Sequence, residues 1–200
     1  MAMDWKQKIL ELARQRGIIR PRDVEAVGIP REYLLRLYRK GDLVRVRRGL
    51  YALPDSLTSE SVTLAEVAKR VPNAVVCLLS ALQFHNLTTQ ISHRVWIAIE
   101  SRKWKPEFDY PPIEVVRFSG RTFNFGVEEH EVDRVPVKIY SPAKTVADCF
   151  KFRNKIGLDA ALEALRDTWR NQKATMDELW EAAKVCRVAN VMRPYLEAVT

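Results

Sequence analysis

Hydrophobic residues at helical spacing mark three short segments at the start of the chain. The first follows Asp4, a candidate N-cap, and ends at Gly17. The second fits about two helical turns within residues 18–27. The third covers residues 31–40. The pattern therefore predicts three helices in succession.

The third segment has two different faces. On a helical wheel Leu34, Leu37 and Tyr38 share one face, and charged residues occupy the opposite one. Pro30 suits the beginning of a helix, and Gly41 suits the position just past its end. We expect a well-bounded helix with one face in a core and one cationic face.

A basic β-hairpin is predicted directly after this helix. Residues 43–47 alternate apolar and basic side chains, Arg48 and Gly49 supply a turn, and residues 50–53 form a second short strand. Three helices followed by a hairpin predict a winged helix-turn-helix. The third helix is then the candidate for the major groove, and the hairpin is a candidate wing that touches phosphates.

The candidate DNA contacts are the polar residues of the third helix and the basic residues of the hairpin. They are Arg31, Glu32, Tyr33, Arg36, Arg39, Lys40, Arg45, Arg47 and Arg48. Glu32 and Arg36 are expected to face base edges, whereas Arg47 and Arg48 are expected to contact the backbone or the minor groove.

Charge is concentrated in this region. Residues 1–56 hold 13 Lys and Arg against 7 Asp and Glu, a net charge of +6 out of +8 for the whole chain. A basic module attracts polyanions and gains affinity through counterion release. The alternative is that the arginines form a solvated helix face and a hairpin edge protected from aggregation by charge. Helix order, cationic face and basic hairpin together favour DNA binding.

The rest of the chain predicts a second domain. Residues 57–61 are polar enough for a linker, so the sequence predicts a DNA-binding domain over residues 1–56 and a second domain over residues 57–200. Predicted helices cover residues 62–71, 80–84, 142–152, 158–171, 175–184 and 188–199, the last broken or kinked at Pro194. Predicted strands cover residues 95–99, 113–118, 123–127 and 135–140, and residues 74–79 fit either a strand or a helix.

The predicted fold class is α+β. A winged helix-turn-helix precedes a mixed α/β domain with a β-rich middle and C-terminal helices. Several strands are short enough to pair as an antiparallel sheet. Lys and Arg number 20 against 18 Asp and Glu in residues 57–200. This balance argues against a second large polyanion footprint, although a local basic patch around residues 151–155 remains open.

Composition narrows the possible functions. No apolar run reaches the roughly 18–20 residues of a membrane span, and the N-terminus lacks the apolar core of a secretory signal, so we expect a cytoplasmic protein without membrane contact. The cysteines Cys77, Cys149 and Cys186 form no CxxC pair and are expected to be reduced core thiols. The three histidines lack paired-ligand spacing, so we expect neither a metal nor a cofactor.

Two other functional classes, a DNA-directed enzyme and a protein-binding adaptor, are alternatives to a DNA-binding regulator. A nuclease or hydrolase delivered to DNA by the winged helix would need clustered carboxylates for Mg²⁺, and Glu100, Asp109 and Glu114 are the candidates near strands. A triad of Ser80, His85 and Asp148 is improbable without a nucleophile elbow. A third hypothesis is an adaptor whose N-terminal domain binds protein. We expect no catalytic residues.

Several motifs resemble one family. The stretches SALQFHNLT, RVWIAI, SPAKTVADCFKFRNKIG and ALEALR, together with the RRGLYALP hairpin, are similar to the AbiEi antitoxins. These are the antitoxin halves of the AbiE abortive-infection, type IV toxin–antitoxin systems used in phage defence. The resemblance covers nearly the whole chain. It implies repression of the protein's own operon through double-stranded DNA, with repeated operator half-sites, and a C-terminal domain that counteracts a nucleotidyltransferase-like toxin.

The C-terminal part of the resemblance rests on a few polar residues. The motif residues are Ser80, His85, Lys144, Thr145, Asp148 and Arg153. Lys144 and Asp148 are four residues apart on a predicted helix, where an exposed ion pair is worth a few tenths of a kcal/mol. We expect these residues to dock a helix on the sheet rather than to catalyse a reaction, and His85 to be a structural histidine near a helix end.

Overall fold

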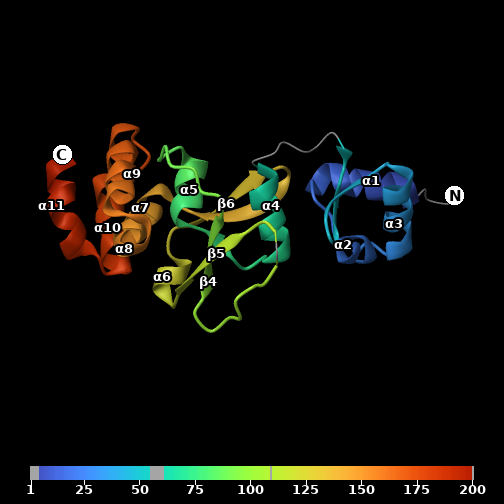
Figure 1. Ribbon diagram of the computed structural model, residues 1–200, viewed down its shortest axis with the longest axis horizontal. Helices are drawn as coiled ribbons and strands as arrows, with labels where there is room; N and C mark the ends of the chain where they lie inside the picture. The colour runs from blue at the N-terminus through green and yellow to red at the C-terminus, as the bar shows by residue number, and fades with distance from the viewer. Residues whose placement is uncertain (1–4, 55–60, 109, 200) are drawn as a thin grey trace. The chain divides into compact units, whose positions relative to one another are not determined.

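The computed structural model describes residues 5–54, 61–108 and 110–199 and divides the chain into two compact units (Figure 1). The first unit comprises Met1–Pro72 and Glu131–Val137, and the second comprises Asn73–His130 and Lys138–Thr200. The predicted domain boundary after Ser56 and the predicted N-cap at Asp4 lie outside the described residues. The α+β class predicted from sequence is confirmed.

The first unit begins with the predicted helices and hairpin. Its elements are α1 (Trp5–Arg16), α2 (Pro21–Glu25), α3 (Arg31–Lys40), β1 (Val44–Arg47), β2 (Leu50–Ala52) and α4 (Ser61–Arg70). Strands β1 and β2 pair in antiparallel fashion, and Ile19, between α1 and α2, forms backbone hydrogen bonds of 2.8 and 2.9 Å with Tyr51 of β2. These bonds tie the wing to the helices.

The apolar faces of the three helices and the hairpin share one core. Its buried residues are Ile9, Leu12, Ala13, Ile19, Val24, Ile29, Leu34, Leu37, Leu43 and Tyr51. The prediction that Tyr38 lies in this core is wrong, because its side chain is 39% exposed and meets the Tyr51 ring edge-on at 5.7 Å. Gly41 ends α3 with φ +80°, which glycine adopts without steric cost.

A mixed sheet forms the centre of the second unit, although residues 131–137, which include parts of two of its strands, belong to the first unit. Its strands are β3 (Val75–Val76), β4 (Val95–Glu100), β5 (Ile113–Phe118), β6 (Val127–Val132) and β7 (Val135–Tyr140), in the spatial order β5-β4-β3-β7-β6. Strand β4 is antiparallel to β3 but parallel to β5, and β7 is parallel to β3. The expected antiparallel sheet is therefore wrong. The connection over residues 101–112 is long enough to bring the chain back to the start of β5, which parallel pairing requires.

The predicted strand over residues 123–127 is also wrong. That stretch holds α6 (Arg121–Asn124), flanked by Gly120 and Gly126 with positive φ, and β6 begins only at Val127. Phe123 and Phe125 pack against the core from this turn rather than from a strand. Strand β6 escaped prediction because it lies at the edge of the sheet, where charged residues interrupt the apolar pattern.

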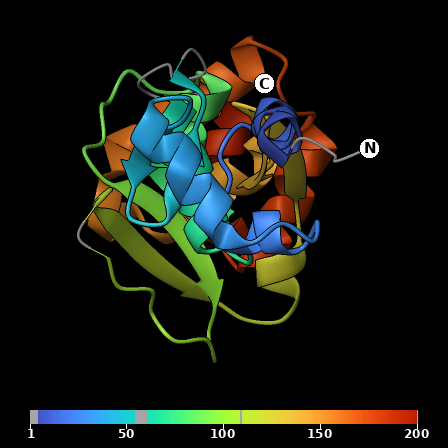
Figure 2. The ribbon, with the colours of Figure 1, turned by 90° about the vertical axis from the view of Figure 1, so that its right-hand side faces the viewer.

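Helices cover the rest of the second unit (Figures 1 and 2). They are α5 (Leu78–His85), α7 (Pro142–Lys151), α8 (Arg153–Ile156), α9 (Leu158–Arg170), α10 (Met176–Cys186) and α11 (Ala189–Val199). The ambiguous stretch 74–79 is a two-residue strand followed by the start of α5. The short helix α8 was not predicted as a separate element. Helix α11 continues through Pro194, so the chain does not break there, and a kink at Pro194 stays a prediction.

Helix α7 lies at the centre of this unit. Ser141 caps it by accepting a hydrogen bond from the Lys144 amide, and every residue from Ala143 to Phe150 is buried. Helices α5, α9, α10 and α11 all pack against it. This environment explains why PAKTVADCF is rich in small and apolar residues.

Gly126 makes the closest backbone approach to this helix. It has φ +66°, and a Cβ there would lie 2.7 Å from the Lys144 Cβ and 2.9 Å from the Ser141 Oγ. Gly126→Ala should therefore lower the free energy of unfolding by about 1–3 kcal/mol, through left-handed strain and overpacking. Urea denaturation would measure the loss. Gly120→Ala is the matched control, because it has φ +52° but open space around the added Cβ, and an equal loss in both variants would show that packing against α7 is irrelevant.

Candidate nucleic-acid interface

One side of α3 is exposed and carries most of the predicted contact residues. Arg31, Glu32, Arg36, Arg39 and Lys40 are exposed, while Leu34 and Leu37 of the same helix are buried. Arg39 and Lys40 lie in the last turn, where the helix dipole favours cations. The helix therefore presents a polar face whose basic character rises toward its C-terminus.

Arg36 is held in place by aromatic packing. Its guanidinium carbon lies 4.8 Å from the centroid of the Tyr33 ring, and the Tyr33 ring meets Trp5 of α1 edge-on at 4.4 Å. Tyr33 is half-buried as a result. A stacked guanidinium keeps its donors free at its edge, so Arg36 is oriented for bidentate hydrogen bonding to an acceptor pair such as the one on guanine.

The hairpin adds three exposed arginines with different surroundings. Arg48 lies in the turn, and Arg45 donates from Nε to the carbonyl oxygen of Arg47 at 3.3 Å. Arg47 itself forms an ion pair with Glu66 of α4, with Nε 3.5 Å from Oε1. Glu66 is almost fully buried and also pairs with Arg70 at 3.0 Å. Burial raises the pKa of Glu66, and the two arginines oppose that shift.

Arg20 makes a second contact between the helices and α4. Its guanidinium pairs with Asp23 at 3.0 Å and donates to the carbonyl oxygen of Lys69 at 2.5 Å. The pKa of Asp23 is lowered because hydrogen bonds and charge from Arg20 outweigh burial. Glu66 and Arg20 were not predicted as functional residues. Nothing in a single sequence indicates which carboxylate will meet the wing.

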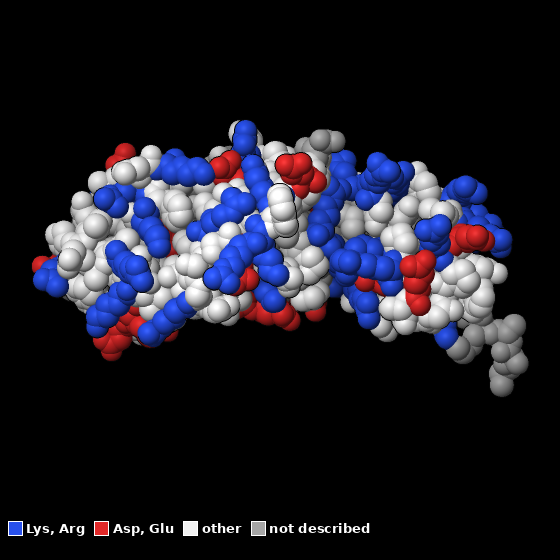
Figure 3. Space-filling view, turned by 90° about the horizontal axis from the view of Figure 1, so that it is seen from below, with Lys and Arg blue, Asp and Glu red and all other residues white. Residues whose placement is uncertain are grey.

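In the view of Figure 3, Lys and Arg cover more of the described surface of this unit than Asp and Glu do. All nine predicted contact residues belong to two elements joined by a three-residue connection, α3 and the β1–β2 hairpin. The structure brings them onto one module. Within this set Tyr33 differs from the arginines and from Lys40. Its ring packs against the protein, whereas their charged ends are exposed.

The C-terminal motif residues are buried instead. Lys144 and Asp148 are both fully inaccessible and form an ion pair inside the core, and the Lys144 Nζ also lies 4.2 Å from the Tyr140 ring centroid and 4.4 Å from that of Phe118. Burial raises the pKa of Asp148, and Lys144 opposes that shift. The expected few tenths of a kcal/mol apply to exposed pairs and do not hold for this one, because both side chains are fully buried.

The other motif residues also have local partners. Thr145 Oγ1 donates to the carbonyl oxygen of Tyr140 at 3.1 Å, and His85 Nε2 lies 2.7 Å from the same oxygen. Ser80 Oγ accepts a hydrogen bond of 2.9 Å from the Trp96 amide, and Arg153 donates to the carbonyl oxygen of Phe150. Burial lowers the pKa of His85. These residues brace helices against the sheet.

The triad that was judged improbable from the sequence is indeed not assembled among these residues. Ser80 bonds to backbone groups of Arg94 and Trp96, just before and within β4. His85 bonds to the Tyr140 carbonyl oxygen, and Asp148 bonds to Lys144 and Cys186. None of the three side chains bonds to another. The described geometry therefore offers no nucleophile activated by a general base.

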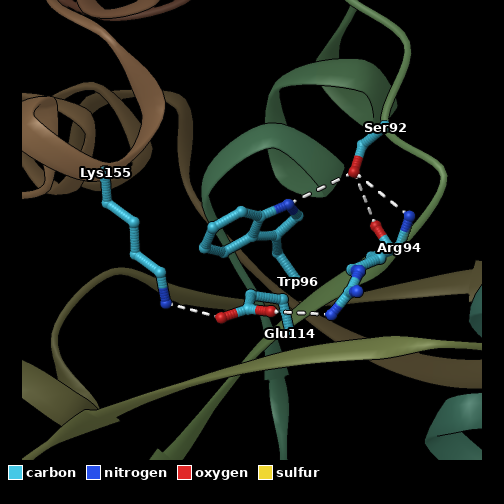
Figure 4. Close-up of polar contacts among 5 residues, drawn as sticks. All are labelled: Ser92, Arg94, Trp96, Glu114 and Lys155. Carbon is cyan, nitrogen blue, oxygen red and sulfur yellow. Dashed lines mark hydrogen bonds and ion pairs between the residues drawn. The ribbon is translucent and has the colours of Figure 1, made fainter.

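Of the carboxylates considered for a nuclease, Glu114 pairs in register with Trp96, four residues before Glu100 on β4. Glu114 is bridged by Lys155 at 2.5 Å and Arg94 at 3.3 Å, with the Lys155 Nζ 5.1 Å from the Trp96 ring centroid (Figure 4). The hydrogen bond from Lys155 lowers the pKa of Glu114. Asp109 lies outside the described residues, and the residues that are described contain no cluster of metal-ligating side chains.

Comparison with known proteins assigns the first module. Residues 7–54, about a quarter of the chain, match the model of a family described as "Transcriptional regulator, AbiEi antitoxin". The N-terminal region is therefore similar to the AbiEi regulators. The predicted resemblance is thereby confirmed for the AbiEi region, which spans α1 to the wing. The C-terminal motifs lie outside the matched residues, so their part of the resemblance stays a prediction.

The whole chain has a structural counterpart. The crystal structure of the RV2827C protein from Mycobacterium tuberculosis aligns with 100% of this chain and 81% of its own, with a TM-score of 0.58 and 15% sequence identity. At that identity the likeness concerns the fold. No curated protein matches the sequence. In the part of the chain that the structure describes, no helix is long and apolar enough to cross a membrane.

Proposed function

We propose that the protein is a DNA-binding repressor of its own toxin–antitoxin operon and the antitoxin to a nucleotidyltransferase-like toxin. The observation that carries the DNA-binding part is the exposed basic face of α3 beside a basic wing, within a region that matches the AbiEi regulators. The helix enters the major groove, and the wing follows the phosphate backbone. Double-stranded DNA from the protein's own promoter is the expected ligand.

The roles of the contact residues follow from their surroundings. Arg36, held by Tyr33 in the middle of α3, reads base edges together with Glu32. Arg48 and Arg45 on the hairpin contact phosphates, as do Arg39 and Lys40 near the end of α3. Arg47 has two roles, a DNA contact and an ion pair within the protein, because its guanidinium also binds Glu66. No enzymatic step is part of this proposal.

The division between reading and positioning has a direct test. Arg36→Ala should weaken binding to the promoter duplex by about 1–3 kcal/mol and relax sequence preference, whereas Arg48→Ala should weaken every duplex similarly and reduce the salt slope by about one. Fluorescence anisotropy with promoter and scrambled duplexes measures both. Arg48 is a cleaner choice than Arg47, since its loss breaks no ion pair that the structure shows.

Equal effects of both substitutions on specific and random duplexes would contradict the division between base reading and phosphate contact. The proposal fails altogether if the folded full-length protein shows no salt-sensitive affinity for its promoter. In that case the exposed arginines are a solvating surface, or the module binds a protein partner. Arg22→Ala in α2 serves as the charge-matched control, because Arg22 is exposed and is not one of the predicted contact residues.

A further inference from the structure

Trp104 differs from the other four tryptophans of the chain. Its side chain is 96% exposed, whereas Trp96 is 8% and Trp169 36% exposed, and Trp5 and Trp180 are half-buried. A large aromatic ring left in water forgoes most of the free energy that burial of its apolar surface would contribute. Its exposure therefore calls for an explanation outside the core.

Cations surround this ring on both sides in the sequence. Arg102, Lys103 and Lys105 are all exposed, and Glu107 is the nearest acidic residue along the described chain. The second unit as a whole has nearly balanced charge, so these three adjacent cations are a local concentration. Among the described residues none of the three forms an ion pair with a carboxylate.

The fold places a fourth cation at the same edge. Residues 101–106 leave the carboxyl end of β4, where the Lys103 amide donates to the Glu100 carbonyl oxygen and the Ser101 amide donates to that of Phe118. These bonds put the start of the loop beside the end of β5, which carries the exposed Arg117. Figure 1 shows the connection as an extended trace from β4 back to β5, and Figure 3 views the side toward which it extends.

We propose that this loop end, defined by Arg102, Lys103, Trp104, Lys105 and Arg117, binds an unpaired stretch of nucleic acid. Trp104 stacks on a base, and the four cations bind the flanking phosphates. Aromatic platforms combined with basic side chains are how proteins hold single strands, because every base has a π face. In a duplex the faces of each base are stacked on the neighbouring base pairs and cannot stack on Trp104. This site is therefore distinct from the duplex contact of α3.

The chemistry around Trp104 favours nucleic acid over a protein partner. Protein interfaces centre on a contiguous apolar core with a polar rim. Here the immediate neighbours of the ring in the sequence are Lys103 and Lys105, and the loop offers cations rather than apolar area. A polyanion with exposed rings satisfies both features at once.

The test uses the full-length protein and fluorescein-labelled single strands of oligo-dT and oligo-rU, about 15 nucleotides long. Saturating unlabelled promoter duplex occupies the winged helix throughout. Trp104→Ala should weaken single-strand binding about tenfold, and Trp104→Phe should retain most of it because a stacking ring remains. Lys105→Ala should reduce the salt slope by about 0.7, the value for one phosphate contact on a single strand.

Two controls keep this result separate from the proposed duplex binding. Ile91→Ala removes another apolar side chain, 80% exposed, and should change nothing. Arg36→Ala should weaken the promoter duplex and leave single-strand binding intact. Unchanged single-strand affinity in Trp104→Ala, with the parent's melting temperature, overturns the proposal. So does loss of binding to phosphatidylserine-containing vesicles without loss of oligonucleotide binding, which would make the loop a membrane contact.

Discussion

Replacing Lys144 alone with alanine should lower the free energy of unfolding by about 3–5 kcal/mol, because it leaves the Asp148 carboxylate buried without its counter-charge. Both side chains are fully inaccessible, and Asp148 would keep only a weak hydrogen bond from the Cys186 thiol at 3.4 Å. Asp148→Ala should cost a similar amount by stranding the ammonium group between two aromatic rings. Urea denaturation followed by circular dichroism measures both.

The double replacement Lys144→Met, Asp148→Leu separates the buried charges from the packing. Apolar residues of similar volume often substitute for a buried ion pair without loss of stability, so this variant should melt close to the parent. If toxin counteraction depends on these residues only through folding, the double variant should still rescue cells that express the cognate toxin. A stable variant that fails to rescue would mean that Lys144 or Asp148 acts directly, against the structural role assigned here.

Deleting the segment after Ser56 should abolish rescue and leave operator binding partly intact. A fragment of residues 1–56 keeps the winged helix-turn-helix but is small enough for marginal stability. A fragment of residues 1–72 should be more stable, because it retains the Glu66 pair with Arg47 and the hydrogen bond from Arg20 to the Lys69 carbonyl. Thermal melting and promoter anisotropy compare the two, alongside a rescue assay in cells.

Glu66→Ala in the longer fragment is the matched control. It removes the buried carboxylate that both Arg47 and Arg70 contact, so it should move the melting temperature back toward that of residues 1–56. Equal stability of all three fragments would show that α4 contributes nothing to the module. A fragment that is folded yet has no affinity for DNA at low salt would contradict the placement of DNA binding in this unit.

The α3 helix and its wing show how far pattern alone reaches. Helix bounds, the Gly41 stop and the hairpin turn follow from local preferences of glycine, proline and alternating apolar residues, and the structure has them close to where they were predicted. Charge density in the first 56 residues pointed to the same module that the family comparison assigns. Tyr38 was wrongly predicted to be buried, because a helical wheel shows which face points toward the core but not how far around the helix the core extends.

The second unit shows which structural features the pattern of hydrophobic and polar residues does not predict. Strand β6 carries three glutamates among its six residues, as suits an edge strand, and Phe123 lies in a helical turn although its neighbours favour a strand. Parallel pairing of β4 with β5 depends on the path of a long loop, which has no local signature. The four-residue spacing of Lys144 and Asp148 predicted their pairing, but not its complete burial.

By itself the sequence determined the elements whose cause is local: the three helices, the wing, the start of α7 just after Ser141, and the basic character of the first module. Only the tertiary structure decided which charges meet water. The arginines of α3 face outward because their helix has a single buried side, whereas the Lys144 pair is sealed because α7 is packed on every side. Burial depends on contacts between residues far apart in the chain, and spacing along one segment carries no record of them.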